Sequence, residues 1–170
     1  MGLRHRKEFR GGCFFVTTSV IKHIRVFEIP DCAEAIMDSL RFYSKKYHID
    51  IAIYVVMPSH LHMILTLSGD TSLSAVMRDF KKYTSIVVKK ILTNNAKYSN
   101  LLRIFRNCAP RGSSRSFKLW QDRFDDVGLV SERVYLTKYQ YILYNPVKAG
   151  LCDRPEDYRW SSFYQPDANK

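Results

Sequence analysis

The feature that most constrains the fold is a pair of apolar segments at residues 51–67, with the sequence IAIYVVMPSHLHMILTL. The β-branched and apolar residues predict two strands. Met57-Pro58-Ser59 predicts the tight turn between them, because Pro58 has no N–H to donate within a ladder. Strands this apolar are typical of the centre of a sheet rather than its edge. We therefore expect a central β-hairpin around which the other elements pack.

The second of these strands begins with His60-Leu61-His62. Side chains alternate along a strand, so His60 and His62 point to one face and Leu61 to the other. Two imidazoles one step apart on a stiff strand can share a metal ion. By itself the pattern is a weak motif, and two histidines on the solvated face of a half-buried strand need bind nothing.

The remaining elements follow from apolar periodicity and from Gly, Pro and Asn signals. Before the hairpin, the sequence predicts a strand at 13–20 and a helix at about 31–47 that starts near Asp31. After it, we expect a break at Gly69-Asp70, a helix capped by Thr71 or Ser72 that ends near 92, and a loop at 93–117 with a short helix at 100–105. A strand at 117–127 and a last helix from 133 to about 145, ended by Pro146 and Gly150, complete the chain. The expected buried stripe of the second helix is Leu73, Val76, Met77, Phe80, Tyr83, Ile86 and Val87. The order β-α-β-β-α-β-α predicts an α+β fold: a ferredoxin-like antiparallel sheet with helices packed on one face, plus an extra C-terminal helix.

The length of 170 residues indicates one domain spanning 1–170. The formal net charge of +11 favours a polyanionic partner, with nucleic acid as the first candidate. The four cysteines are scattered, as is typical of reduced thiols in a cytoplasmic protein. We expect no membrane association, because no apolar run reaches transmembrane length and the N-terminus has no signal-peptide core.

Basic residues gather in two segments. The first contains Arg4, Arg6 and Lys7 and is either an arm that contacts phosphates or a solvated end. The second, the basic loop at about 93–117, contains Arg111 and Arg115 and is either a mobile insertion or a loop that contacts nucleic acid. Its charge favours the latter.

The last helix carries YQYILYNPVKAG at residues 139–150. Tyr141 and Asn145 are four residues apart and share a face, so a phenol nucleophile and an amide metal ligand could be presented together. Tyrosine has a pKa near 10 and needs a metal or a positive neighbour to react; Lys148 is close in sequence. Alternatively, Tyr139, Tyr141 and Tyr144 are core aromatics and Asn145 only precedes a proline.

In combination these segments resemble a known family. MPSHLHMIL at 57–65 is similar to the HUH motif of single-tyrosine transposases of the insertion-sequence type, and YILYNPVKAGL at 141–151 is similar to their tyrosine-bearing helix. LWQDRFDD at 119–126 and YRWSSF at 158–163 also resemble family segments. The resemblance covers nearly the whole chain and is strongest to the REP-associated tyrosine transposases. Two features differ from the family pattern. Leu143 stands where many relatives have histidine or an aromatic residue, and the basic loop is longer than we expect.

The resemblance implies a set of roles. His60 and His62 correspond to the metal-binding pair, Asn145 to a third, weaker ligand, and Tyr141 to the nucleophile. It implies Mg²⁺ or Mn²⁺ as cofactor and cleavage and rejoining of single-stranded or hairpin DNA through a 5′-phosphotyrosine. We expect a monomer or homodimer on the bacterial nucleoid.

Two rival functions stay open at the level of sequence. One is a catalytically silent protein of the same fold that only binds hairpin DNA. The other is an RNA-binding ferredoxin-like domain that stacks bases on exposed sheet aromatics. We rank the RNA-binding function last, because the predicted sheet face carries the histidine pair instead.

Overall fold

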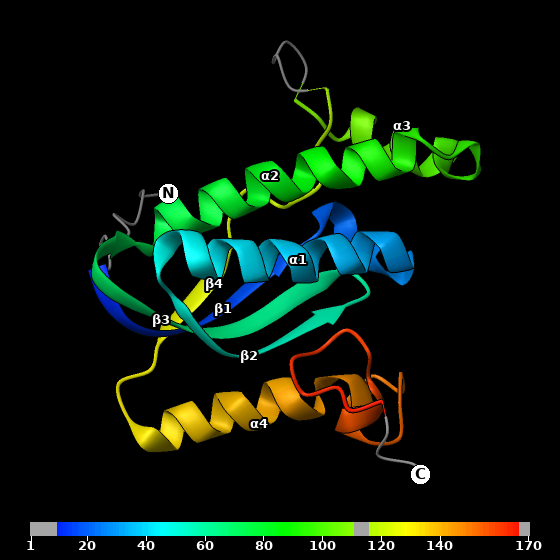
Figure 1. Cartoon of the computed structure of the whole chain (residues 1–170). Coiled ribbons are helices and arrows are strands. Elements are labelled where there is room, and N and C mark those ends of the chain that lie inside the picture. Colours follow the sequence, from blue (N-terminus) through cyan, green and yellow to red (C-terminus); the bar gives the residue numbers. More distant parts are fainter. Residues whose placement is uncertain (1–9, 111–115, 167–170) are drawn as a thin grey trace, which may run out of the picture.

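The computed structural model describes residues 10–110 and 116–166 (Figure 1). Four strands form one antiparallel sheet in the order β2-β3-β1-β4, and the bounds are β1 Arg10–Ser19, β2 Asp50–Met57, β3 His60–Ser72 and β4 Asp125–Gly128. The α-helices are α1 Pro30–Tyr47, α2 Leu73–Thr93, α3 Ser99–Asn107 and α4 Glu132–Lys148. Short 3-10 helices lie at Ile21–His23, Val26–Glu28, Ala96–Tyr98 and Pro155–Asp157. The predicted α+β class and element order are confirmed.

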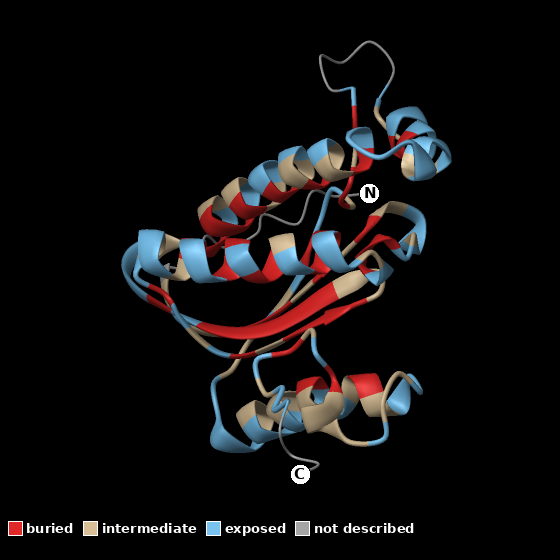
Figure 2. Cartoon of the chain, turned by 45° about the vertical axis from the view of Figure 1, so that its right-hand side comes forward, coloured by how far each residue is buried: buried red, intermediate tan, exposed pale blue. Residues whose placement is uncertain are grey.

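The sheet is covered on both faces. Helices α1 and α2 lie on one side of it and α4 on the other (Figure 1), so most of the sheet is buried (Figure 2). Alternation along β1 divides the core accordingly: Phe14 and Val16 join the cluster under α1 and α2, while Phe15 joins the smaller cluster with Ile142 of α4. The C-terminal helix therefore closes the face that would otherwise be open to solvent.

The hairpin forms as predicted, with Met57 paired to His60 across the turn. Only its second strand is central, because β2 is an edge strand of the sheet. The C-terminal segment covers the outer side of β2, where the Val56 amide donates to the Trp160 carbonyl at 2.8 Å. The prediction that Gly69-Asp70 breaks the second strand is wrong, because β3 continues to Ser72. Gly69 adopts a left-handed conformation with φ of 59°, which a glycine accepts without the strain of a Cβ. The strand bends there and still pairs with β1, whose register shifts between Arg10 and Gly12.

The buried stripe of α2 is predicted correctly only in its first half. Tyr83 and Ile86 are 47% and 59% exposed, and the buried residues are Leu73, Val76, Met77, Phe80, Thr84, Val88 and Leu92. The polar Thr84 can occupy the core because its hydroxyl donates to the Phe80 carbonyl at 2.7 Å and accepts from Nε1 of Trp120 at 2.9 Å. In its second half the buried stripe therefore runs through Thr84, Val88 and Leu92 rather than through Tyr83, Ile86 and Val87.

The segment between α2 and β4 is more structured than expected at its start and less regular at its end. The short helix is confirmed as α3, within the predicted basic loop. The strand predicted at 117–127 is wrong over most of its length, since only β4 forms a ladder with β1. Phe117, Leu119 and Trp120 are buried in the core under α2, so their apolar character reflects packing rather than strand pairing.

Helix α4 begins as predicted, with the hydroxyl of Ser131 accepting from the Val134 amide at 3.4 Å. The prediction that Pro146 ends it is wrong. Proline removes the bond that its own N–H would make to the Ile142 carbonyl and crowds that carbonyl, but the helix continues past it to Lys148. Gly150, with φ of 67°, lies just beyond the helix end.

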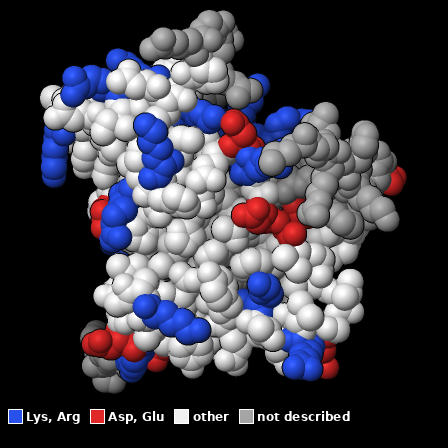
Figure 3. Space-filling view, turned by 180° about the vertical axis from the view of Figure 1, so that it is seen from behind, with Lys and Arg blue, Asp and Glu red and all other residues white. Residues whose placement is uncertain are grey.

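The surface of the described residues carries basic side chains over both helical layers, at the level of α2 and α3 and again near α4 (Figure 3). All four cysteines are free thiols, as predicted. Within the described ranges, no helix is long and apolar enough to cross a membrane.

Candidate active site

His60 and His62 lie at the start of β3, between β2 and β1, on the sheet face that α4 covers. Their ring centroids are 4.6 Å apart, which confirms the prediction that both point to the same face. Leu61 points into the opposite core. His62 is only 4% exposed and His60 is partly buried, so neither is a solvated surface histidine.

The orientation of His62 is fixed by β1. Thr17 pairs with His62 in the sheet register, and the Thr17 hydroxyl lies 2.7 Å from Nδ1 of His62. When Nδ1–H donates to this hydroxyl, Nε2 keeps a free lone pair that can bind a metal. The Ser59 hydroxyl lies 3.3 Å from Nδ1 of His60, so Nε2 is the free nitrogen in that ring as well.

Both imidazoles are held in the neutral form. Burial lowers the pKa of His60, with a smaller contribution from His23. Burial also lowers the pKa of His62, to about 3, and the charges of His60 and Lys138 add to the effect. A neutral imidazole is the form that binds metal ions. The pair is therefore ready to act as a ligand at neutral pH without losing a proton.

Tyr141 of α4 reaches the histidine pair. Its hydroxyl lies 3.5 Å from Nε2 of His62, and the two rings meet edge to face with centroids 5.1 Å apart. Phe15 supports both, stacked on His62 at 5.6 Å and edge-on to Tyr141 at 5.9 Å. Tyr141 remains 39% exposed, so a substrate can approach its hydroxyl.

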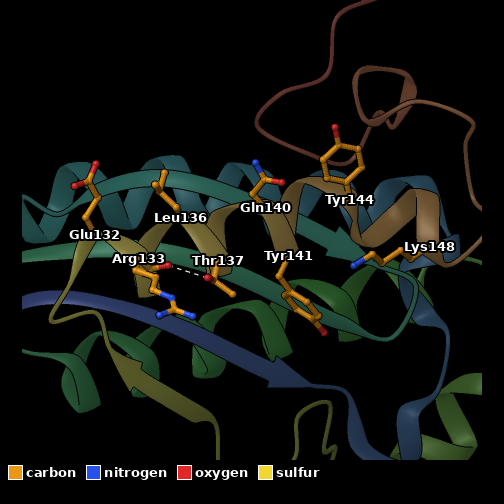
Figure 4. Close-up of a pocket in the computed structure, with 8 residues that line it drawn as sticks. All are labelled: Glu132, Arg133, Leu136, Thr137, Gln140, Tyr141, Tyr144 and Lys148. Carbon is orange, nitrogen blue, oxygen red and sulfur yellow. Dashed lines mark hydrogen bonds between the residues drawn. The ribbon is translucent and has the colours of Figure 1, made fainter.

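The neighbouring tyrosines lie differently. Tyr139 packs in the cluster under the sheet and stacks on Tyr135 with centroids 6.1 Å apart. Tyr144 is 42% exposed and points away from Tyr141 (Figure 4). Among the tyrosines of the described part of the chain, Tyr141 is the one that contacts the histidine pair.

Asn145 lies one turn beyond Tyr141 and is half buried. In the described ranges its side chain makes no hydrogen bond, and no group of three His, Cys, Asp or Glu side chains that could hold a metal is present there. An amide or a water would therefore have to complete a metal site on His60 and His62. The assignment of Asn145 as that ligand stays a prediction.

A groove runs along α4 past Tyr141 (Figure 4). Arg133, Thr137 and Tyr141 point to one side of the helix, and the Lys148 ammonium points back toward Tyr141. The assignment of Lys148 as a DNA contact stays a prediction. The other predicted contacts, Arg4, Arg6, Lys7, Arg111 and Arg115, are outside the described residues.

Sequence reasoning missed three residues of this site: Phe15, Thr17 and Lys138. Phe15 and Thr17 belong to β1, and they lie beside His62 because β1 pairs with β3. No local sequence pattern predicts that pairing. Lys138 is three residues before Tyr141 on α4, so the helical spacing that linked Tyr141 to Asn145 could have found it.

Known proteins resemble the chain in sequence and fold. The family model described as "Transposase IS200 like" matches residues 16–142, which run from β1 to just beyond Tyr141. A Haemophilus influenzae protein assigned as a REP-associated tyrosine transposase is 21% identical over 163 residues, 95% of this chain and 85% of that protein. The REP-associated tyrosine transposase of Escherichia coli is 27% identical over 117 residues. That match covers 68% of this chain and about half, 55%, of the relative.

A solved structure of a REP-associated tyrosine transposase bound to a REP hairpin has the same fold. It superposes with a TM-score of 0.69 over 96% of this chain and 83% of the other, at 22% sequence identity. The arrangement of the sheet and helices around the candidate site is therefore an arrangement already found in a solved protein.

Proposed function

The chain belongs to the IS200-like transposase family, and we propose that it cleaves and rejoins single-stranded DNA through a covalent bond between Tyr141 and a 5′ phosphate. The observation that carries this proposal is the 3.5 Å approach of the Tyr141 hydroxyl to Nε2 of His62. It puts the phenol oxygen of Tyr141 beside a neutral, buried imidazole. In this structure both residues belong to the same chain.

The reaction balances with the groups at hand. The Tyr141 hydroxyl oxygen forms a bond to phosphorus, the bond from phosphorus to the 3′ oxygen breaks, and the phenol proton passes to solvent while the departing oxygen takes one up. The products are a 5′-phosphotyrosine and a free 3′-hydroxyl. One phosphoester replaces another, so attack by a 3′-hydroxyl on the phosphotyrosine rejoins DNA without a nucleotide cofactor.

The histidine pair fits a divalent metal. His60 and His62 each offer a free Nε2, their lowered pKa values keep them neutral, and Asn145 would add an amide oxygen. This donor set suits Mn²⁺ and is acceptable to Mg²⁺. A bound ion would supply Lewis-acid polarisation of the scissile phosphate. The chain itself fixes the two rings through Thr17 and Ser59 and aligns Tyr141 through Phe15.

We propose hairpin DNA of the REP type as the substrate, with the protein acting as a transposase or a domesticated relative. The relatives in this family include REP-associated tyrosine transposases, and the solved structure with this fold is bound to a REP hairpin. The net charge of +11 suits a polyanion. A flexible single strand beside the hairpin could enter the groove along α4 and reach Tyr141.

The test is a denaturing gel with labelled hairpin DNA that carries a single-stranded flank. With Mn²⁺ or Mg²⁺ the wild type should give a covalent protein–DNA band, and EDTA should remove it. The variant Tyr141→Phe keeps the ring and serves as the control without the nucleophile. Binding to the hairpin with no covalent band under any metal condition would refute the proposed cleavage and support the silent DNA-binding protein instead.

A further inference from the structure

Lys138 lies on α4 three residues before Tyr141, so the two side chains share one side of the helix. Its Nζ lies 4.6 Å from the ring centroid of Phe15 and 5.8 Å from that of Tyr141. Lys138 is half buried. Its ammonium is therefore held over the aromatic rings of the candidate site rather than extended into solvent.

Phe15 connects this ammonium to the reactive groups. It stacks on the imidazole of His62 with an interplanar angle of 20° and meets Tyr141 edge-on at 82°. Phe15, His62, Lys138 and Tyr141 thus form one cluster in which every member contacts at least one other ring.

The cluster lacks an anion. Across the described residues, no ion pair joins Lys138 to a carboxylate. Asp125 of β4 is opposite Thr17 in the sheet register and so faces the same side of the sheet, but it too forms no recorded ion pair with Lys138. Aromatic faces compensate only part of the cost of keeping an ammonium half buried. An anion beside Lys138 and Tyr141 would balance the positive charge of the Lys138 ammonium.

We infer that Lys138 binds the scissile phosphate: its ammonium pairs with a non-bridging oxygen of the phosphodiester that Tyr141 attacks, and stays paired with it in the phosphotyrosine. This inference rests on the proposed function and adds a catalytic residue to it. Lys138 neither forms nor breaks a bond. The phosphate gains negative charge as Tyr141 attacks, so the ion pair is stronger in the transition state and should accelerate the chemical step more than it tightens binding.

The first experiment compares single-turnover adduct formation by Lys138→Met, Lys138→Arg and wild type on the same hairpin DNA. Lys138→Met preserves an unbranched side chain over Phe15 but removes the charge, and should slow the reaction about 10- to 100-fold, the range for one charge-assisted hydrogen bond. The dissociation constant of the whole DNA should change little. Lys138→Arg should recover most of the rate. Lys90→Met on α2, exposed and on the other side of the sheet, is the matched control and should react like wild type.

The second experiment replaces the scissile phosphate by an uncharged methylphosphonate. Without the anionic oxygen, Lys138 has nothing to pair with, so wild type and Lys138→Met should react at the same rate. If Lys138 only packs on Phe15, Lys138→Met should slow the reaction of both substrates by the same factor relative to wild type. That result would overturn the inference. Equal rates of the two proteins on ordinary DNA would also overturn it. If wild type forms no adduct on either substrate, the proposed function fails first and this inference falls with it.

Discussion

The hydroxyl of Tyr141 lies 3.5 Å from Nε2 of His62, although 79 residues separate them along the chain. The sheet brings His62 to the centre of one face, and α4 crosses that face with Tyr141 pointing inward. The nitrogen that faces the phenol is the one that Thr17 leaves free. The candidate nucleophile and a candidate metal ligand therefore lie next to each other in the folded protein.

Replacing His60 by alanine tests the metal assignment. His60 is partly buried and belongs to neither of the two apolar core clusters, so we expect a folded protein with an unchanged circular dichroism spectrum. Cleavage of hairpin DNA with Mn²⁺ should fall more than about 100-fold, because loss of a direct ligand should cost more than loss of a supporting hydrogen bond. A variant that cleaves at the wild-type rate would show that His60 is no ligand.

Thr17 offers a subtler test, because it touches His62 and not the proposed metal. Thr17→Val keeps the shape and removes the hydroxyl that holds Nδ1 at 2.7 Å. Affinity for Mn²⁺, measured by calorimetry, should drop about 10- to 100-fold, the usual effect of losing a partner that orients a ligand. Thr17→Ser should restore it. Equal affinity in all three proteins would mean that the hydroxyl does not orient the ring.

The buried histidine predicts a loss of stability in acid. The pKa of His62 is lowered from 6.5 to about 3 in the folded protein. Below pH 6.5 this histidine is therefore protonated in the unfolded chain but stays neutral in the folded protein. Stability should fall as the pH drops through this window, by about 2 kcal/mol from this residue at about pH 5. Denaturant unfolding without metal, at neutral pH and at about pH 5, measures the loss.

The variant His62→Gln separates this effect from the titration of carboxylates. This variant lacks the titrating ring. Between neutral pH and about pH 5 it should therefore lose about 2 kcal/mol less stability than the wild type. If both proteins lose equal stability, the imidazole of His62 is not held neutral in the folded state.

Binding of DNA should depend strongly on salt. The charge of +11 predicts several phosphate contacts, and the logarithm of the binding constant should fall with the logarithm of salt concentration by about 0.7 per contact for a single strand. Lys148, which points toward Tyr141, should account for one of them. Fluorescence anisotropy of Lys148→Met should show a shallower slope, and an unchanged slope would remove Lys148 from the interface.

Much of the fold was predictable because its signals are local. The hairpin turn at Pro58, the N-cap at Ser72 and the start of α4 at Ser131 each depend on a few adjacent residues. The errors occurred where tertiary packing overrides local preference. Thr84 is buried because Trp120 satisfies it, and Pro146 stays within α4 although proline often ends a helix.

The same distinction applies to the site. The common face of His60 and His62 follows from strand alternation, and it is confirmed by their 4.6 Å ring separation. The contact of Tyr141 with His62 was expected only through the family resemblance, because no spacing relates residues on different elements. Thr17 and Phe15 were not foreseen, since the partner of a central strand is chosen by the whole sheet. The metal ligation and the nucleophile stay predictions.

The most direct test of the account is the site of the covalent bond to DNA. Wild type and the variants Tyr139→Phe, Tyr141→Phe and Tyr144→Phe are incubated with hairpin DNA and Mn²⁺, digested with protease and nuclease, and analysed by mass spectrometry. Tyr139 packs against Tyr135, and Tyr144 points away from Tyr141, so both of these variants should still form the adduct. In the wild type we predict a phosphotyrosyl–DNA peptide that carries the nucleotide on Tyr141. Tyr141→Phe should still fold and bind DNA but should give no such peptide. An adduct on Tyr139 or Tyr144, or one that persists in Tyr141→Phe, would contradict it.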